Sequence, residues 1–435
     1  MSHRHRISPR TCLVASLLIV AFGSAHAAER ISVATGGGQA NSQSRFPAIS
    51  ANGRYVTFLS DATNLVAGDT NAAADVFVRD RVLGTTTRVS VKAGGAQSEA
   101  GSFAATISGD GSRIVFSSHG QLVPTAGFLN CYLLDRTAGT LQILDLKPNG
   151  SAGTFGCDYP SIDVAGTRIA YASRDALTVS DTNGRPDIFV RDLVAGTQRR
   201  VSGAPGDTNA NNGASDPRLS GDGSRVLFAS LASNLVASDT NGIVDMFVAA
   251  TDNSIAPQRV NVGPGGVQAN DTTDYLGALN ANGSLLAFSS NATSLPDWGE
   301  FAESTQYLRI PSSDTTIALS IPEGNLPREG FNGEPDFDYT GRWLVFASTD
   351  RLFAGSEQGG VYVIDLVRGR ISLVSAGGNT GNVHQPRISA DGTGVVWYSF
   401  SATQVPNDTN GTWDVFYAVN PLWEEMPIFA DDFEG

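Results

Sequence analysis

The feature that most constrains this fold is an internal repeat that runs through almost the whole chain. Its core has the form Pro-x-Ile-Ser-x-Asp-Gly-Ser-Arg-Val-x-Phe-x-Ser, as in "DPRLSGDGSRVLFAS" from Asp216 and "AATISGDGSRIVFSS" from Ala104. Seven copies occur, and their turn glycines lie 51 to 60 residues apart: Gly53, Gly111, Gly166, Gly223, Gly283, Gly341 and Gly392. A fixed period of this length indicates one supersecondary unit stacked seven times.

Each unit is predicted to form four strands, which we call A to D. Strand A is the "P-x-I-S" piece, and its proline is expected at the strand start, where a sheet tolerates a residue without an N–H. An Asn-Gly or Asp-Gly turn, a strong hairpin signal, leads into strand B. Strand C is the "DVFVRD" type of run, and a glycine turn leads from it into strand D, for example "TTRVSV". The prolines are Pro47, Pro160, Pro217, Pro335 and Pro386.

Strands such as "RIVFSS" and "DIFVRD" carry apolar residues on both faces. Such strands suit a sheet that is packed between two neighbouring sheets rather than one with a face in water. Small four-stranded sheets stacked radially form a β-propeller. The sequence therefore predicts an all-β fold, a seven-bladed β-propeller.

The two ends of the repeat region are predicted to meet. The last unit lacks a strand D, whereas "ERISVATGGGQA" from Glu29 matches "TRVSVKAGGAQS" from Thr87, which contains strand D of the first unit. A strand within residues 29–35 should therefore complete the last blade and leave no exposed sheet edge. Removing residues 29–35 should harm the fold more than removing the C-terminal tail.

The hairpin "S-x-D-G-S-R-I-x-F-S", followed by "D-I-F-V-x-D" and a glycine turn, resembles the TolB-type, WD40-like propeller repeat over residues 29–421. The chain departs from TolB in lacking the α/β domain that precedes the propeller and in having longer B–C loops. The resemblance implies a propeller that binds proteins or other ligands, and it implies no reaction.

The ends of the chain predict export. Residues 1–27 have a basic start, an apolar run from Cys12 to Phe22 and an Ala-x-Ala site ending at Ala27, which is typical of a signal peptide. The propeller is predicted to span residues 28–421, with a tail at 422–435. No later segment is apolar enough to cross a membrane. We therefore expect a secreted or periplasmic protein with no membrane insertion.

The formal net charge is −14, and loss of the three signal arginines makes it more negative. Such a surface disfavours nucleic acid as a partner. We expect a monomer that binds a protein or a glycan. Cys131 and Cys157 are the cysteines outside the signal, and they are predicted either to form a disulfide, which an oxidising compartment permits, or to remain buried thiols.

An Asp-Thr-Asn loop between strands B and C recurs in four units. It supplies oxygen atoms at positions 1, 3 and 7, which could bind calcium with help from carbonyls and water. The spacing differs from that of an EF-hand. In the alternative interpretation the loop is a structural turn, because Asp and Asn bond their own backbone and the last Asp caps strand C. The candidate ligands are Asp69, Asn71 and Asp75; Asp181, Asn183 and Asp187; Asp239, Asn241 and Asp245; and Asp408, Asn410 and Asp414.

A second candidate site lies at the mouth of the predicted central channel. Alignment of the strand A starts places six polar side chains near the axis, each from a different blade: Arg45, Asp158, Asp216, Asp274, Glu334 and His384. Convergent carboxylates are suited to hold a cation or to act as acid and base on a sugar, as in a lyase or glycosidase, and the alternative is a solvated funnel. Trp298 and Trp413, in B–C loops, would stack on a sugar or pack on a neighbouring loop.

Overall fold

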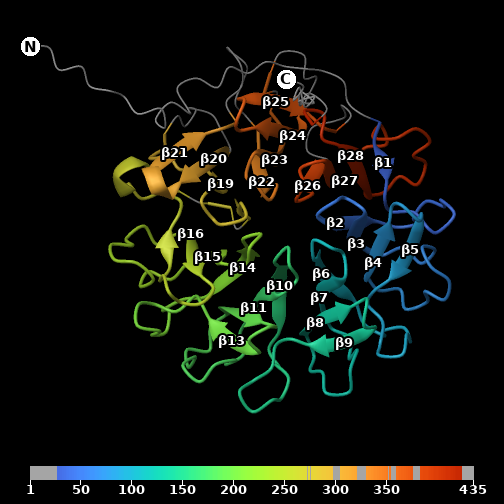
Figure 1. The fold of residues 1–435 in the computed structure, drawn as a ribbon, viewed down its shortest axis with the longest axis horizontal. Coiled ribbons are helices and arrows are strands. Elements are labelled where there is room, and N and C mark those ends of the chain that lie inside the picture. The colour runs from blue at the N-terminus through green and yellow to red at the C-terminus, as the bar shows by residue number, and fades with distance from the viewer. Residues whose placement is uncertain are drawn as a thin grey trace, which may run out of the picture.

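The computed structural model describes residues 27–271, 273–274, 276–296, 304–320, 330–350, 352–353, 359–375 and 383–423. Within them, seven four-stranded antiparallel sheets surround a central axis (Figure 1). The predicted seven-bladed β-propeller is therefore confirmed. No helix among these residues is long and apolar enough to span a bilayer. The predicted signal peptide, apart from Ala27, and tail residues 424–435 lie outside the described residues.

Blades 1 to 4 follow the predicted order of strands. Blade 1 consists of β2 (Ser44–Ile49), β3 (Tyr55–Ser60), β4 (Asp75–Asp80) and β5 (Thr85–Arg88). Blade 2 consists of β6 (Ser102–Ile107), β7 (Arg113–Ser118), β8 (Asn130–Asp135) and β9 (Thr140–Ile143). Blade 3 consists of β10 (Cys157–Ile162), β11 (Arg168–Ser173), β12 (Asp187–Asp192) and β13 (Thr197–Arg200). Blade 4 consists of β14 (Ala214–Leu219), β15 (Arg225–Ser230), β16 (Asp245–Ala250) and β17 (Gln258–Arg259).

Blades 5 to 7 complete the ring. Blade 5 consists of β18 (Ala278–Leu279), β19 (Leu286–Ser290), β20 (Thr305–Ile310) and β21 (Thr315–Ala318). Blade 6 consists of β22 (Asn332–Phe337), β23 (Trp343–Ser348), β24 (Gly360–Asp365) and β25 (Arg370–Leu373). Blade 7 consists of β26 (Val383–Ile388), β27 (Gly394–Ser399), β28 (Asp414–Val419) and β1 (Glu29–Arg30). Two short 3-10 turns, η1 (Pro264–Gly266) and η2 (Pro311–Ser313), lie between strands.

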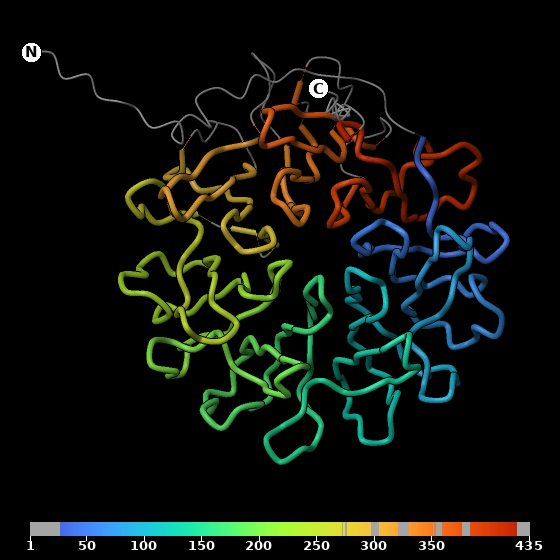
Figure 2. Tube along the Cα trace, viewed as in Figure 1, coloured from blue at the N-terminus to red at the C-terminus, as the bar shows by residue number. Residues whose placement is uncertain are grey.

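The predicted closure by the N-terminal strand is confirmed. β1 pairs with β28, with Glu29 opposite Tyr417 and Arg30 opposite Phe416. In Figure 2 the blue N-terminal segment lies beside the red C-terminal blade. The ladder is shorter than the predicted range of 29–35, and beyond it Ile31 donates its N–H to the Val415 carbonyl at 2.8 Å.

Apolar clusters between neighbouring blades form the core. Each of seven clusters joins two adjacent sheets, including the cluster in which Ile31 from the N-terminus contacts residues of blades 7 and 1. Every blade also contains one aromatic pair between strands B and C, such as Phe58 with Phe77. Burial on both faces explains why strands B and C are apolar at nearly every position.

Strand A differs from the prediction in one respect. The prolines lie at the fourth residue of the strand, within a β-bulge, and not at its start. The residue before each proline has a positive φ, as for Asp216 (53°) and Glu334 (57°). A bulge leaves a backbone N–H position outside the ladder, so it accepts a residue that has no N–H.

At the A–B turns, backbone hydrogen bonds join all seven blades in a closed ring. Each bond runs from one turn to the next blade's turn, with N···O distances of 2.8 to 3.1 Å. The circuit passes through Ala51, Gly109, Val164, Gly221 with Asp222, Ala281, Tyr339, and Ala390 with Asp391, and then returns to Ala51. Main-chain contacts thereby join the blades in a closed circle at this end of the channel.

A disulfide adds one covalent link between blades. Cys131 in β8 and Cys157 in β10 are bonded, with Cα atoms 5.4 Å apart. The link joins blade 2 to blade 3. The interfaces in the described part of the chain combine the apolar clusters and the ring with further hydrogen bonds, such as that from Arg113 Nη1 to the Gly166 carbonyl.

Candidate functional site

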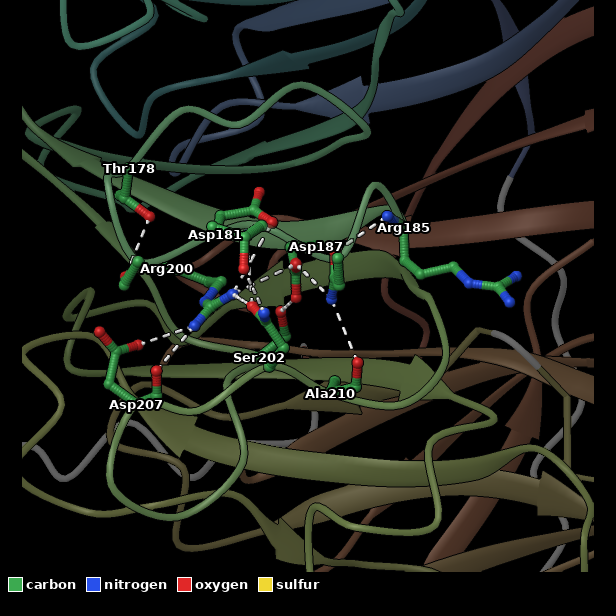
Figure 3. Close-up of polar contacts among 12 residues, drawn as sticks. Thr178, Asp181, Arg185, Asp187, Arg200, Ser202, Asp207 and Ala210 are labelled. Atoms are coloured by element: carbon green, nitrogen blue, oxygen red, sulfur yellow. Dashed lines mark hydrogen bonds and ion pairs between the residues drawn. The ribbon is translucent and has the colours of Figure 1, made fainter.

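The four Asp-Thr-Asn loops share one arrangement, in which an arginine from strand D lies between the first and last aspartates. In blade 1, Arg88 Nη1 is 3.1 Å from Asp69 Oδ1 and 3.2 Å from Asp75 Oδ2. In the other three loops the arginine is Arg200, with Asp181 and Asp187; Arg259, with Asp239 and Asp245; or Arg30, with Asp408 and Asp414. Figure 3 shows the blade 3 example.

The asparagine and the last aspartate of each loop also form hydrogen bonds within the protein. In blade 3, Asn183 Nδ2 donates to Asp187 at 3.3 Å and to the Ala210 carbonyl at 3.1 Å. Ser202 donates to the other Asp187 oxygen at 2.5 Å. The equivalent amides of Asn71, Asn241 and Asn410 also donate to the last aspartate of their loops. The loop is thus a turn tied to strand D and to the following D–A loop.

Burial controls the electrostatics of these loops. It raises the pKa of Asp181 to about 6, with a further rise from the nearby Asp187 charge and an opposing effect of Arg200. Burial also raises the pKa of Asp187, Asp69, Asp239 and Asp414. The arginine is therefore the cation that balances two desolvated carboxylates in each loop.

The contacts favour the structural-turn interpretation of these loops, and calcium binding stays a prediction from the sequence. Calcium prefers six to eight oxygen ligands, whereas here a guanidinium and an amide N–H face the carboxylates. No group of three or more His, Cys, Asp or Glu side chains in the described ranges is placed to hold a metal ion.

A thermal melt tests the calcium prediction directly. We expect the midpoint of the mature protein to be the same in millimolar calcium and in chelator, because the arginines already balance the carboxylates. Calcium at a hundred times its dissociation constant would instead add about 2.7 kcal/mol per site. A clear upward shift that is smaller in Asp181→Asn would establish a metal site in the blade 3 loop.

The six residues predicted at the channel mouth do not form one group. Asp158 and Asp216 line the central cavity, whereas Arg45 turns to Asp61, at 3.6 Å. His384 Nδ1 lies 3.8 Å from Glu334 Oε2. Asp216 and Glu334 occupy the third position of their strands, at the bulge, whereas Arg45, Asp158 and His384 occupy the second position and Asp274 precedes β18. The alignment by strand starts therefore mixed positions before the bulge with positions at the bulge.

Burial and mutual repulsion perturb the carboxyls around the channel. Burial, with a contribution from Glu334, raises the pKa of Asp274 to about 6. Burial also raises the pKa of Glu334, Asp216 and Asp158. Among the described residues, Asp274 Oδ2 is buried and has no hydrogen-bond partner. Asp274 and Glu334 thus form a carboxyl pair from adjacent blades that favours a bound proton.

Aromatic side chains gather where blades 7 and 1 meet the same mouth. His384 stacks on Tyr398, and Trp413 contacts His384, Tyr398 and Phe400 at centroid distances of 5.4 to 5.7 Å. Phe400 remains 47% exposed. Trp413 therefore packs within an aromatic cluster, and Trp298 lies outside the described residues.

The central cavity holds charged residues that the sequence analysis missed. It has a volume of about 490 Å³ and is walled by the strand A segments and A–B turns of the blades. Arg218, Asp336 and Arg387 line it at the fifth position of strand A in blades 4, 6 and 7. The sequence signal for these residues is a charged residue directly after the strand A proline, on a strand that must face the axis.

No protein-family model and no curated protein matches the chain. Among solved structures, it is similar to an oligogalacturonate lyase in complex with manganese, at 14% identity over 87% of this chain and 90% of that one, with a TM-score of 0.52. It is also similar to prolyl endopeptidases, at 11% identity over 87% of this chain and 50% of that one, with a TM-score of 0.53.

TolB from Acinetobacter baumannii matches 68% of this chain and 58% of its own length, at 16% identity and a TM-score of 0.38. Identities this low concern the fold alone, and folds of this kind carry many functions. The chain is a seven-bladed β-propeller, and its similarity to these structures concerns that fold.

Proposed function

We propose that this chain is an exported binding module, secreted or periplasmic, that takes its ligand in the central channel. The observation that supports the proposal is the cavity of about 490 Å³ with charged side chains from several blades on its wall. A concave pocket with a few convergent polar groups of perturbed pKa is the usual form of a ligand site.

The apolar core between blades does not depend on the charges in the channel, although Asp336 also accepts the Ile388 N–H of the next blade. The interfaces between blades consist of apolar clusters, and the A–B turns are joined by the backbone ring. Placing Asp216, Arg218, Asp336 and Arg387 around a cavity costs desolvation, which raises the carboxyl pKa values and lowers that of Arg218. Because these charged side chains are desolvated around a cavity, a role in binding a ligand is favoured over a purely structural role.

A second candidate function is that of a carbohydrate-active enzyme at the channel mouth. The specific observation is the Asp274–Glu334 pair, because a carboxyl with a pKa of about 6 can hold a proton near neutral pH and act as a general acid. The aromatic cluster around Trp413 supplies flat apolar faces of the kind that stack on sugar rings. An oligogalacturonate lyase with a similar fold is consistent with this candidate but carries no argument for its reaction.

Filling the cavity tests the binding proposal. Ala48 lines the cavity, whereas Ala138 is exposed in the C–D turn of blade 2 and is not one of the lining residues, so Ala48→Phe and Ala138→Phe make the same chemical change in different places. The mature protein is first screened on arrays of glycans and peptides, and bound compounds are then measured by calorimetry. We expect Ala48→Phe to weaken binding at least tenfold and Ala138→Phe to leave it unchanged. Equal affinities in both variants would place binding outside the channel.

The same compounds separate the two candidate functions. Every bound glycan is incubated with the protein, and its products are examined by mass spectrometry. If the enzyme candidate holds, Asp274→Asn and Glu334→Gln should abolish cleavage while the protein stays folded. If every bound glycan is recovered intact, the enzyme candidate is excluded and the binding proposal stands.

A further inference from the structure

Two arginines from distant blades line the central cavity at the same level. Arg218 is the fifth residue of β14 in blade 4, and Arg387 is the fifth residue of β26 in blade 7. Both strands are innermost in their blades (Figure 1). The two guanidinium groups are close enough that the charge of Arg387 lowers the pKa of Arg218, after the larger effect of burial.

The donors of these two groups are almost unused. A guanidinium carries five N–H donors. Among the described residues, Arg218 makes no hydrogen bond or ion pair, and Arg387 donates only from Nη1 to the Pro386 carbonyl, at 2.9 Å. Elsewhere the blades pair their arginines closely, as in Arg54 with Asp80 at 2.8 Å and Arg342 with Asp365 at 2.7 Å.

The nearby carboxyls do not neutralise the pair by contact. Asp336 Oδ2 accepts the Ile388 N–H at 3.0 Å, and Glu334 Oε2 accepts the Gln385 N–H at 2.5 Å. Burial raises the pKa of both carboxyls, and the charges of Arg387 and Arg218 oppose that rise. Burial lowers the pKa of Arg218 only to about 9, so it remains charged at neutral pH. The cavity therefore contains two arginines, most of whose N–H donors form no hydrogen bond with the described part of the protein.

We propose that Arg218 and Arg387 bind a carboxylate group of the ligand that enters the channel. This inference rests on the proposed function and names the chemical class of its ligand. A carboxylate between the two guanidinium groups would accept their free N–H donors, in the bidentate geometry that arginine favours, and would relieve their mutual repulsion. A monoanion suits the cavity better than a phosphate dianion, because Asp216, Asp336 and Glu334 lie close to the arginines.

The carboxylate could come from a sugar acid or from the C-terminus of a peptide. Calorimetry of the mature protein distinguishes these sources with four probes: glucuronate against glucose, and acetyl-trialanine against its amide. Inorganic phosphate is a fifth probe. We expect at least one carboxylate probe to bind, its uncharged counterpart to bind at least tenfold more weakly, and phosphate to bind more weakly than the carboxylate.

Two variants locate the bound group. Arg218→Gln and Arg387→Gln should each weaken the carboxylate probe at least tenfold, and Arg185→Gln, which removes an exposed charge, should not. The thermal midpoints of the channel variants should equal or exceed that of the wild type, because each change removes a partly buried cation that has no contact ion pair. A lower midpoint would assign the arginines a structural role and overturn the inference.

Failure of this inference differs from failure of the proposed function. If a ligand from the arrays is lost in Ala48→Phe but binds equally well to both arginine variants, the channel binds its ligand without a carboxylate contact. The carboxylate probes are tested at concentrations up to about 10 mM, which is ten times a dissociation constant of 1 mM. If none of them binds, the inference is also overturned, whatever the arrays show.

Discussion

Removal of residues 28–35 is expected to leave a chain that does not reach a stable closed fold, the largest effect we expect in this protein. These residues contain β1, the outer strand of blade 7, which pairs with Tyr417 and Phe416 of β28. Without it, β28 becomes an exposed sheet edge, and the first and last blades lose the strand that joins them.

The energy of this segment is comparable with the stability of a whole domain. Ile31 is fully buried between blades 7 and 1, and loss of such a side chain costs about 2–5 kcal/mol. Asp414 is also fully buried and loses both Arg30 and Ser32, and breaking a buried ion pair costs about 3–5 kcal/mol. Domains are commonly stable by only about 5–15 kcal/mol.

Circular dichroism melts and size-exclusion chromatography check this result. The matched control is a chain that ends at residue 423, which lacks 12 residues of the tail but keeps every described contact of β28. We expect the control to melt cooperatively near the wild-type midpoint and the N-terminal truncation to be unfolded or aggregated. A truncated chain that melts within a few degrees of the wild type would show that the ring closes without β1.

Replacement of Arg200 by methionine is expected to lower the free energy of unfolding by about 3–5 kcal/mol at neutral pH. Arg200 is 2% exposed, and its guanidinium faces Asp181 and Asp187, which are themselves buried. Methionine retains much of the apolar stem but leaves two carboxylates without their cation. Arg185→Met, in the exposed part of the same loop, should change stability by no more than about 0.5 kcal/mol.

The loss should depend on pH in a defined direction. Removal of Arg200 raises the pKa of Asp181 above its present value of about 6, because Arg200 lowers that pKa. A carboxyl with a raised pKa in the folded state stabilises the protein below its unfolded pKa of about 4, and this contribution is lost as pH rises through the folded value. Urea denaturation should therefore give a smaller difference from wild type at pH 5 than at pH 7.5. A pH-independent difference would mean that lost packing, not charge, explains the effect.

The sequence predicts the number of blades and the closure because both follow from repetition. The role of the strand D arginines was missed, although the chain carries a signal for it. The position of Arg88, opposite Phe77, holds arginine in each blade that has an Asp-Thr-Asn loop. In the three other blades that position is apolar, and the residue opposite is tyrosine: Ile143 with Tyr132, Ala318 with Tyr307, and Leu373 with Tyr362.

The channel residues were predicted less well, for a geometric reason. A β-bulge inserts one residue and changes which side chains face the axis, and here its positive φ falls on residues such as Asp216 and Glu334 rather than on glycine. In five blades a proline follows the bulge residue, but a proline also suits the start of a strand, so the local pattern alone does not reveal the bulge. Arg218 and Arg387, which follow the bulge, could be placed in the channel only once the bulge was known.

The closed ring at the A–B turns has a consequence for how proteins of this design can diversify. Every donor and acceptor in it is a peptide group, so its side chains can be exchanged where space allows. Gly221 is one limit, because a Cβ there would meet the Tyr339 ring at 2.7 Å. The width of the channel at this end therefore follows from the number of blades. The loops at the opposite rim can change in length and sequence, and with them the binding specificity, without any change in the diameter of the propeller.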